Sequence, residues 1–231
     1  MKVAYTSTQA GKYAKFIKGS FSWNFMEEPA IMRNLKPVVK STTKALDAGC
    51  GTGHSTKLLL ELGIRKENIL GVDVSEDMLI YARKSLPGVR FTQVSLSELK
   101  LKENSLDLIL SVMVFQFLIK QEYGRMITNF SRFLVKGGYL FFITLHPIRF
   151  SHDHKDYFKK KTKTENTPWG TKIEYQHRTF TDYITPLIKS SLELKLLEEI
   201  TPVKSGAVKD TLQYEKYSSV PTRLAVMAIK K

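Results

Sequence analysis

The sequence has little of what a secreted or membrane-spanning protein needs. Cys50 is the single cysteine among 231 residues, so no internal disulfide can form. No uninterrupted apolar run reaches the roughly 18–20 residues of a transmembrane helix, and residues 1–16 contain no apolar segment of a secretory signal. We therefore expect a cytoplasmic protein without a membrane partner.

Acidic residues are also scarce relative to basic ones. The chain has 36 Lys and Arg against 22 Asp and Glu, which gives a formal net charge of +14. Such a surplus attracts anions, so the partner could be nucleic acid, an anionic membrane face or an acidic small molecule. A merely solubilising surface explains the charge equally well, because the basic residues are spread along the chain.

What the sequence does contain is a regular alternation of strand and helix patterns. Short apolar runs that end in glycine or a carboxylate alternate with amphipathic segments. Such units build a parallel sheet that is covered on both faces, which predicts an α/β fold with a doubly wound sheet. The expected strands are 44–48, 69–74, 89–94, 106–111 and 139–145, and the expected helices between them are 55–62, 75–85 and 121–134.

The flanking segments depart from this alternation. Two helices are expected within residues 8–36, and a long polar insertion follows the fifth strand. The last two strands, 192–200 and 223–229, have only a polar connection between them, which predicts an antiparallel pair at the edge of the sheet. We interpret the chain as a single domain with a helical cover (1–40), a core (41–147), a lid or insertion (148–180) and a C-terminal helix and strand pair (181–231).

A glycine-rich loop joins the first strand to the first helix of the core. Residues 47–53 carry glycine at every second position from Gly49, which allows a sharp turn and a close approach to a ligand. The helix that follows offers free N–H groups. Asp73 ends the next strand about 20 residues later, where a carboxylate can hold both hydroxyls of a ribose. The pattern predicts a nucleotide cofactor.

Two classes of cofactor use this arrangement. Dinucleotide sites carry Gly-x-Gly-x-x-Gly and place a pyrophosphate at the helix N-terminus, whereas this loop reads Gly-x-Gly-x-Gly. Asp47, two residues before Gly49, would repel a pyrophosphate but suits the ammonium and sulfonium charges of S-adenosylmethionine (SAM). The residues therefore favour SAM over NAD.

Four segments in order resemble the motifs of class I SAM-dependent methyltransferases. Residues 46–53 (LDAGCGTG) resemble the SAM-binding signature, and residues 71–79 resemble the acidic second motif. Residues 104–111 are similar to the fourth strand, and residues 133–140 to the turn before the fifth. The resemblance is to the methyltransferase-11-like branch of small-molecule enzymes. It implies a Rossmann-like, seven-stranded, mostly parallel sheet and transfer of a methyl group from SAM.

The resemblance also implies which residues contact SAM. The glycine loop would face the methionine end and Asp73 the ribose. Ser95 stands where the family often has an aspartate that contacts the adenine, so the adenine would depend more on Leu96 and on apolar packing. The expected cofactor contacts are Asp47, Gly49, Cys50, Gly51, Gly53, Asp73, Val74, Met78, Ser95, Leu96 and Ser111.

The acceptor side is less specific. His146 ends the fifth strand and His177 precedes the last helix, so either could act as a general base, with a structural role equally good for each. Arg178 suits a carboxylate or phosphate. Together with Gln116, after the fourth strand, and Tyr183, it is a candidate for substrate binding.

Three functions remain open. A small-molecule O- or N-methyltransferase leads, because methyl transfer from SAM mainly needs orientation and requires no obvious catalytic residue. An RNA methyltransferase would use the positive charge, but the chain has no Asn/Asp-Pro-Pro-Tyr/Phe run. A non-catalytic SAM-binding protein is the third. No metal is expected, because the histidines of residues 152–154 match no established site.

Overall fold

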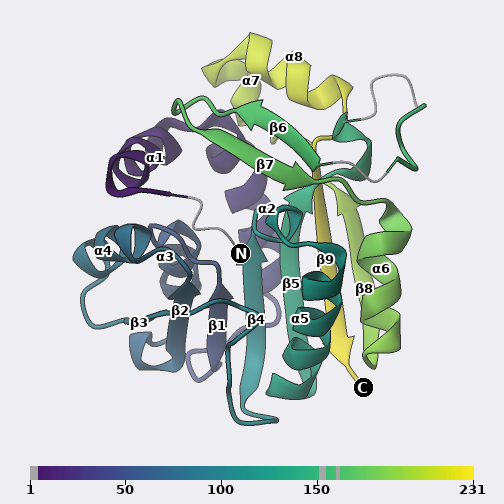
Figure 1. Ribbon diagram of the computed structural model, residues 1–231. Helices are drawn as coiled ribbons and strands as arrows, with labels where there is room; N and C mark the ends of the chain where they lie inside the picture. Colours follow the sequence, from purple (N-terminus) through teal and green to yellow (C-terminus); the bar gives the residue numbers. More distant parts are fainter. Residues whose placement is uncertain (1–4, 151–154, 160–161) are drawn as a thin grey trace.

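A seven-stranded sheet with helices on both faces forms the centre of the molecule (Figure 1). The computed structural model describes residues 5–150, 155–159 and 162–231. The strand order is β3-β2-β1-β4-β5-β9-β8. The strands are β1 Ala45–Ala48, β2 Ile69–Asp73, β3 Arg90–Gln93, β4 Leu106–Val112, β5 Leu134–Leu145, β8 Leu192–Glu199 and β9 Arg223–Lys230.

The strand directions confirm the predicted fold class. β1 pairs in parallel with both β2 and β4, β2 with β3, and β4 with β5. β9 is antiparallel to both β5 and β8, as the helix-free strand pair predicts. The chain runs outward from β1 to β3 on one side and from β4 to β5 on the other. The strand order therefore reverses between β1 and β4, which is where open α/β sheets bind ligands.

Alternating apolar side chains supply a core on each face of the sheet. Ile109 and Phe142 pack with α5 (Lys120–Phe133) and α6 (Phe180–Lys189), while their neighbours Leu108 and Phe141 pack with the opposite helices. The opposite face is covered by α2 Glu28–Leu35, α3 His54–Glu61 and α4 Glu76–Ser85. The Ser75 hydroxyl accepts a hydrogen bond from Met78 N and so caps the start of α4.

The N-terminal segment forms the two expected helical pieces. They are α1 (Ser7–Gly19) and α2, with the short π-helix η1 (Trp23–Glu27) between them. Short 3₁₀ turns occur as η2 Lys66–Asn68, η3 Phe115–Phe117 and η4 Pro147–Phe150. In the part of the chain that the structure describes, no helix is long and apolar enough to cross a membrane.

Two connections have more structure than the sequence indicated. The polar insertion contains an antiparallel hairpin, β6 (Thr162–Asn166) and β7 (Lys172–Gln176), rather than an irregular loop. The segment 201–220 holds α7 (Ser205–Lys209) and α8 (Thr211–Ser219) rather than a plain polar link. In Figure 1 both lie across the upper end of the sheet, beyond the carboxyl ends of β4 and β5.

Aromatic side chains fasten the tip of the hairpin to the N-terminal helix. The Trp169 ring lies 5.1 Å from the Tyr13 ring and 4.9 Å from the Phe16 ring, between centroids. Tyr5 stacks on the same Trp169 ring. The hairpin and α1 therefore close over the carboxyl edge of the sheet from opposite sides.

Candidate active site

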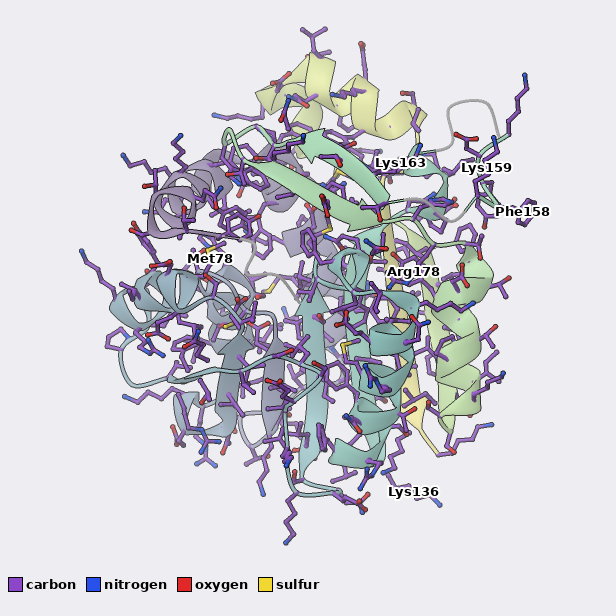
Figure 2. The ribbon with its side chains drawn as sticks, in the orientation of Figure 1. Met78, Lys136, Phe158, Lys159, Lys163 and Arg178 are labelled. Atoms are coloured by element: carbon purple, nitrogen blue, oxygen red, sulfur yellow. The ribbon has the colours of Figure 1, made fainter. Side chains whose placement is uncertain are left out.

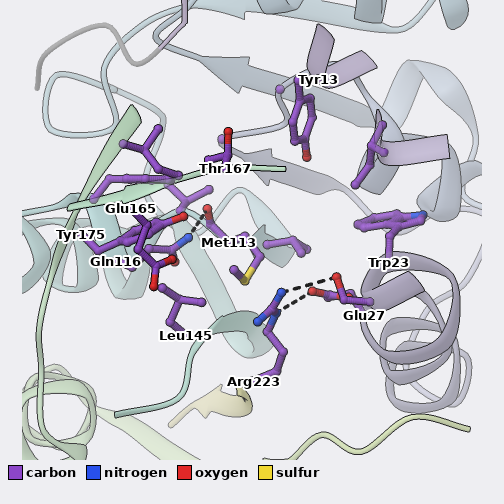
Figure 3. A pocket seen from close by; sticks show the side chains of 18 of the residues that line it. Tyr13, Trp23, Glu27, Met113, Gln116, Leu145, Glu165, Thr167, Tyr175 and Arg223 are labelled. Carbon is purple, nitrogen blue, oxygen red and sulfur yellow. Dashed lines mark hydrogen bonds and ion pairs between the residues drawn. The ribbon is translucent and has the colours of Figure 1, made fainter. Parts of the chain in front are cut away.

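A cavity of about 1500 Å³ lies under the hairpin, at the carboxyl ends of the central strands. It exceeds the roughly 300–1,000 Å³ typical of a pocket for one small ligand, so it has room for a cofactor and a second molecule. Its walls come from the glycine loop, the ends of β2 and β4, the segment α1–η1, the hairpin, and residues 216–223. Figure 3 shows part of the lining.

The glycine loop turns sharply at the end of β1. The N–H groups of Gly49 and Cys50 both donate to the Val72 carbonyl, at 2.8 and 3.0 Å. Gly49 has φ +79°, and a Cβ built on it would lie 2.3 Å from Val114 Cγ2. The position therefore needs glycine for its backbone conformation and also for space.

Asp73 closes the loop from the neighbouring strand. Its Oδ2 accepts from Gly51 N and its Oδ1 from Ser75 N, each at 2.9 Å. Burial raises the pKa of this carboxyl, and the backbone hydrogen bonds oppose that shift. Each carboxylate oxygen keeps a further acceptor site. Because Asp73 lines the cavity beside Val74, Met78 and Leu96, these residues fit a ribose and an adenine ring.

Asp47 lies beneath the loop and is not among the residues that line the cavity, so its contact with the cofactor stays a prediction. It is fully buried, and its Oδ2 accepts from Ser55 Oγ at 2.8 Å and from Thr56 Oγ1 at 2.5 Å. It thus ties β1 to the start of α3, and it positions the loop indirectly. Its Oδ1 has no hydrogen-bond partner among the described residues.

Burial raises the pKa of Asp47 to about 6, which predicts a pH dependence of stability. The unfolded carboxyl titrates near 3.9, so the folded protein binds the proton more tightly and loses stability as pH rises from about 4 to about 6. The loss should be about 2–3 kcal/mol, and Asp47→Asn should lack it. Urea unfolding measures the free energy of unfolding of both proteins. We expect the difference between the wild type and Asp47→Asn to fall by this amount between pH 4 and pH 7. A pH-independent difference would contradict the burial effect.

The remaining expected cofactor contacts divide into two groups. Gly49, Cys50, Gly51, Asp73, Val74, Met78 and Leu96 line the cavity. Gly53, Ser95 and Ser111, like Asp47, are not among the lining residues. Gly53 faces Ala82 and Leu86, Ser95 bonds Ser97, and the Ser111 hydroxyl donates to Ala48 O. Contact of these three residues with the cofactor stays a prediction.

Comparison with known proteins agrees with this cofactor geometry. Residues 46–142 match the family model of a methyltransferase domain. A putative SAM-dependent methyltransferase from Listeria monocytogenes superposes with a TM-score of 0.73 at 23% identity, over 89% of this chain and 98% of the other. Residues 46–142 therefore form a methyltransferase domain, on the fold that SAM-dependent methyltransferases share.

Relatives found by sequence match very different shares of the chain. An uncharacterized protein of Haemophilus influenzae is 29% identical over 94% of this chain and 92% of its own length. A trans-aconitate 2-methyltransferase of Methylobacterium nodulans is 37% identical, but over 42% of this chain and 36% of its own length. The chain thus spans about a third of that enzyme, so the match does not identify the acceptor. SAM is the cofactor of the family and of this methyltransferase.

His146 is a buried structural group in the methyltransferase. Its Nε2 lies 2.9 Å from Glu199 Oε1, and its Nδ1 accepts from Ile148 N at 3.2 Å. This pattern makes Nε2 the protonated nitrogen that donates to Glu199. Burial lowers the pKa of His146, and Glu199 opposes that shift. Both ring nitrogens are occupied outside the cavity, which corrects the expectation of a base at this position.

The polar residues near α6 also serve the fold. Arg178 donates from both terminal nitrogens to the carbonyls of Phe115 and Leu118 and is 4% exposed. In Figure 2 Arg178 lies above α5, well away from Met78 on the opposite side of the view. His177 Nε2 contacts the Tyr157 carbonyl at 2.7 Å, and Tyr183 is buried with its hydroxyl 3.1 Å from Thr144 Oγ1. None of the three lines the cavity, so expecting them at the acceptor is corrected.

Gln116 is the one expected acceptor residue that the structure brings to the cavity. Its amide is already engaged, because Nε2 donates to Met113 O at 2.7 Å and Oε1 accepts from Thr144 Oγ1 at 3.2 Å. It therefore holds the turn after β4 in place. Residues 152–154, discussed above as a metal motif, lie outside the described residues.

The structure also assembles cavity residues that sequence patterns did not single out. Met113 has a left-handed backbone, with φ +57°, directly after β4. Glu27 and Arg223 form a buried ion pair from opposite ends of the chain. His54, at the start of α3, has its pKa lowered to about 4, mainly by burial. Position in the sequence pointed to two of these residues, His54 beside the glycine loop and Met113 directly after the fourth strand.

Proposed function

We propose that this methyltransferase transfers the methyl group of SAM to oxygen or nitrogen of a small molecule held in the cavity. The observation that carries the proposal is the charge of the cavity lining. Five acidic residues and four basic ones line it, although the whole chain has a net charge of +14. The excess positive charge therefore lies elsewhere, and the site itself does not attract a polyanion such as RNA.

The character of the walls supports a compact acceptor. Eight aromatic residues line the cavity, and the hairpin and α1 cover it. A covered aromatic cavity suits an acceptor that is small enough to be enclosed, and it excludes water from the transfer. In this proposal the hairpin and its connections, within residues 148–180, act as the substrate cover.

The roles of the chain follow from the nature of the reaction. SAM supplies an activated methyl group when it is bound. In our proposal Asp73 holds the ribose hydroxyls, Met78 and Leu96 flank the adenine, and the backbone at Gly49 and Gly51 receives the methionine part. The protein then contributes mainly orientation, which is worth up to roughly 7–11 kcal/mol in favourable cases.

Labelled methyl transfer tests the proposal. The purified protein is incubated with SAM that carries an isotopic methyl label. One reaction contains an extract of small metabolites, and the other contains total RNA, both prepared from cells of the organism that encodes the protein. We expect label in the small-molecule fraction and none in RNA. Label in RNA alone would replace the proposal with the nucleic-acid alternative. Binding of S-adenosylhomocysteine without transfer to either pool would favour a non-catalytic protein.

A further inference from the structure

A buried ion pair stands in the wall of the cavity, on the side of the N-terminal helices. Glu27 ends η1 and Arg223 begins β9, and both line the cavity (Figure 3). Arg223 Nε donates to Glu27 Oε1 at 2.6 Å, and the two side chains are 9% and 4% exposed. Burying two charges is costly, so the pair needs all its hydrogen-bonding groups satisfied.

One oxygen of the pair is left over. Glu27 Oε2 is buried and has no hydrogen-bond partner among the described residues. Arg223 also donates to Thr222 O at 3.3 Å and Ser22 Oγ at 3.4 Å, and its guanidinium faces the Glu27 carboxylate with two contacts in Figure 3. Glu27 Oε2 therefore keeps acceptor capacity that no hydrogen bond among the described residues uses.

A second unsatisfied group lies next to it. Thr222 precedes Arg223 and also lines the cavity, and its Oγ1 has no hydrogen-bond partner among the described residues. Buried polar atoms are normally hydrogen-bonded, so these two oxygens are positions where a molecule in the cavity can supply a donor.

The ion pair is connected to both halves of the cavity. Burial, followed by the carboxylates of Glu27 and Asp73, raises the pKa of Tyr13, so this phenol stands within electrostatic reach of both acids. On the other side, the Arg223 charge interacts with the Tyr175 phenol. Tyr13 and Tyr175 both line the cavity, so each member of the ion pair acts on a phenol of the cavity wall.

An apolar surface adjoins the pair at the hairpin side. Leu145, Ile173 and Tyr175 form a small buried cluster on which Met113 and Phe117 pack. The Phe117 and Tyr175 rings are stacked, with centroids 5.4 Å apart. We call these five residues the apolar wall. A flat, hydrophobic ligand body would bury its surface against it.

We propose that Glu27, fixed by Arg223, is the hydrogen-bond acceptor that binds the methyl acceptor through a hydroxyl or amino group, while the apolar wall holds an aromatic body. The substrate class is thus a neutral aromatic compound with an O–H or N–H donor, and carboxylates are rejected. A substrate carboxylate would face Glu27 without a proton between them, and that repulsion supplies the selectivity. The inference rests on the proposed function, because it assumes that the acceptor occupies this cavity.

Equilibrium binding to the protein saturated with S-adenosylhomocysteine tests the inference. The probes are 2-naphthol, naphthalene and 2-naphthoate, which share one ring system and differ in the polar group. In the wild type we expect 2-naphthol to bind about ten times more tightly than naphthalene, the value of one well-placed hydrogen bond. We expect 2-naphthoate to bind more weakly than either.

The variant Glu27→Gln keeps the side-chain shape and an oxygen for Arg223. It should abolish the advantage of 2-naphthol over naphthalene and improve the binding of 2-naphthoate. Glu174→Gln is the matched control, because Glu174 also lines the cavity but lies on the exposed face of β7, and it should leave the ranking unchanged. Unchanged S-adenosylhomocysteine affinity in each variant shows that the fold persists.

Several outcomes would overturn the inference. The first is an equal preference for 2-naphthol over naphthalene in the wild type and in Glu27→Gln. The second is an effect of Glu174→Gln on the ranking as large as that of Glu27→Gln. The third is tight binding of 2-naphthoate by the wild type. Failure of all three probes to bind the wild-type complex would also overturn it. If Glu27→Gln does not fold, the wild-type ranking decides alone. Failure of the wild type to bind S-adenosylhomocysteine at all would instead count against the proposed function.

Discussion

Replacing Asp73 with alanine should weaken S-adenosylhomocysteine binding by about 3–6 kcal/mol, because in our proposal two hydrogen bonds from ribose hydroxyls to this carboxylate are lost, at about 1.5–3 kcal/mol each. Asp73 also fixes the loop through Gly51 N and Ser75 N, so the substitution removes preorganisation as well. Titration calorimetry on the purified variant measures the change directly.

Asp77→Asn is the control for this measurement. Asp77 lies in the first turn of α4, close to Asp73 in sequence, but it does not line the cavity. It removes the same formal charge and should change the affinity by less than about 0.5 kcal/mol. An affinity of Asp73→Ala equal to that of wild type would contradict the ribose assignment.

Gly49→Ala should reduce the free energy of unfolding by about 2–5 kcal/mol, and it should abolish cofactor binding in the fraction that still folds. A left-handed backbone costs a non-glycine residue about 1–2 kcal/mol, and overpacking adds about 1–3 kcal/mol. Both apply here, since φ is +79° and the new Cβ would lie 2.3 Å from Val114 Cγ2. Urea unfolding measures the first effect and calorimetry the second.

Gly51→Ala separates the two causes. Gly51 has φ +52° and no atom within 4 Å of a built Cβ, so only the backbone cost applies. Its stability loss should be about 1–2 kcal/mol. The double variant Gly49→Ala/Val114→Ala should recover the overpacking part of the loss. Equal losses in Gly49→Ala and Gly51→Ala, with no recovery in the double variant, would show that contact with Val114 is unimportant.

The core of the fold could be predicted because its causes are local. A buried strand such as Leu106–Val112 is a nearly continuous apolar run, and the amphipathic pattern of Glu76–Ser85 begins at a serine cap. The glycine loop and Asp73 are equally local, because the end of each strand defines their place. These features give the sheet, its helices and the ribose side of the cavity.

The covering elements were less predictable. The strand Thr162–Asn166 consists of Thr, Lys, Glu and Asn, so it carries no apolar alternation, and it forms because it pairs with Lys172–Gln176. The short helices in residues 205–219 are held through Gly206, which packs on Phe21 and Phe25. Their signals come from partners that are distant in the chain.

Arg178 and Arg223 show most clearly where the sequence ceases to decide. By itself the sequence determined the class of fold, the SAM cofactor and the position of Asp73 at the end of its strand, because strand ends and glycine turns obey short-range rules. It could not distinguish an arginine that two backbone carbonyls occupy from an arginine that holds a carboxylate toward the cavity. Only the tertiary structure decided that, because hydrogen bonds join residues as far apart in the chain as Glu27 and Arg223. The acceptor site that we propose therefore depends on long-range packing, which alone brings Glu27 and Arg223 together.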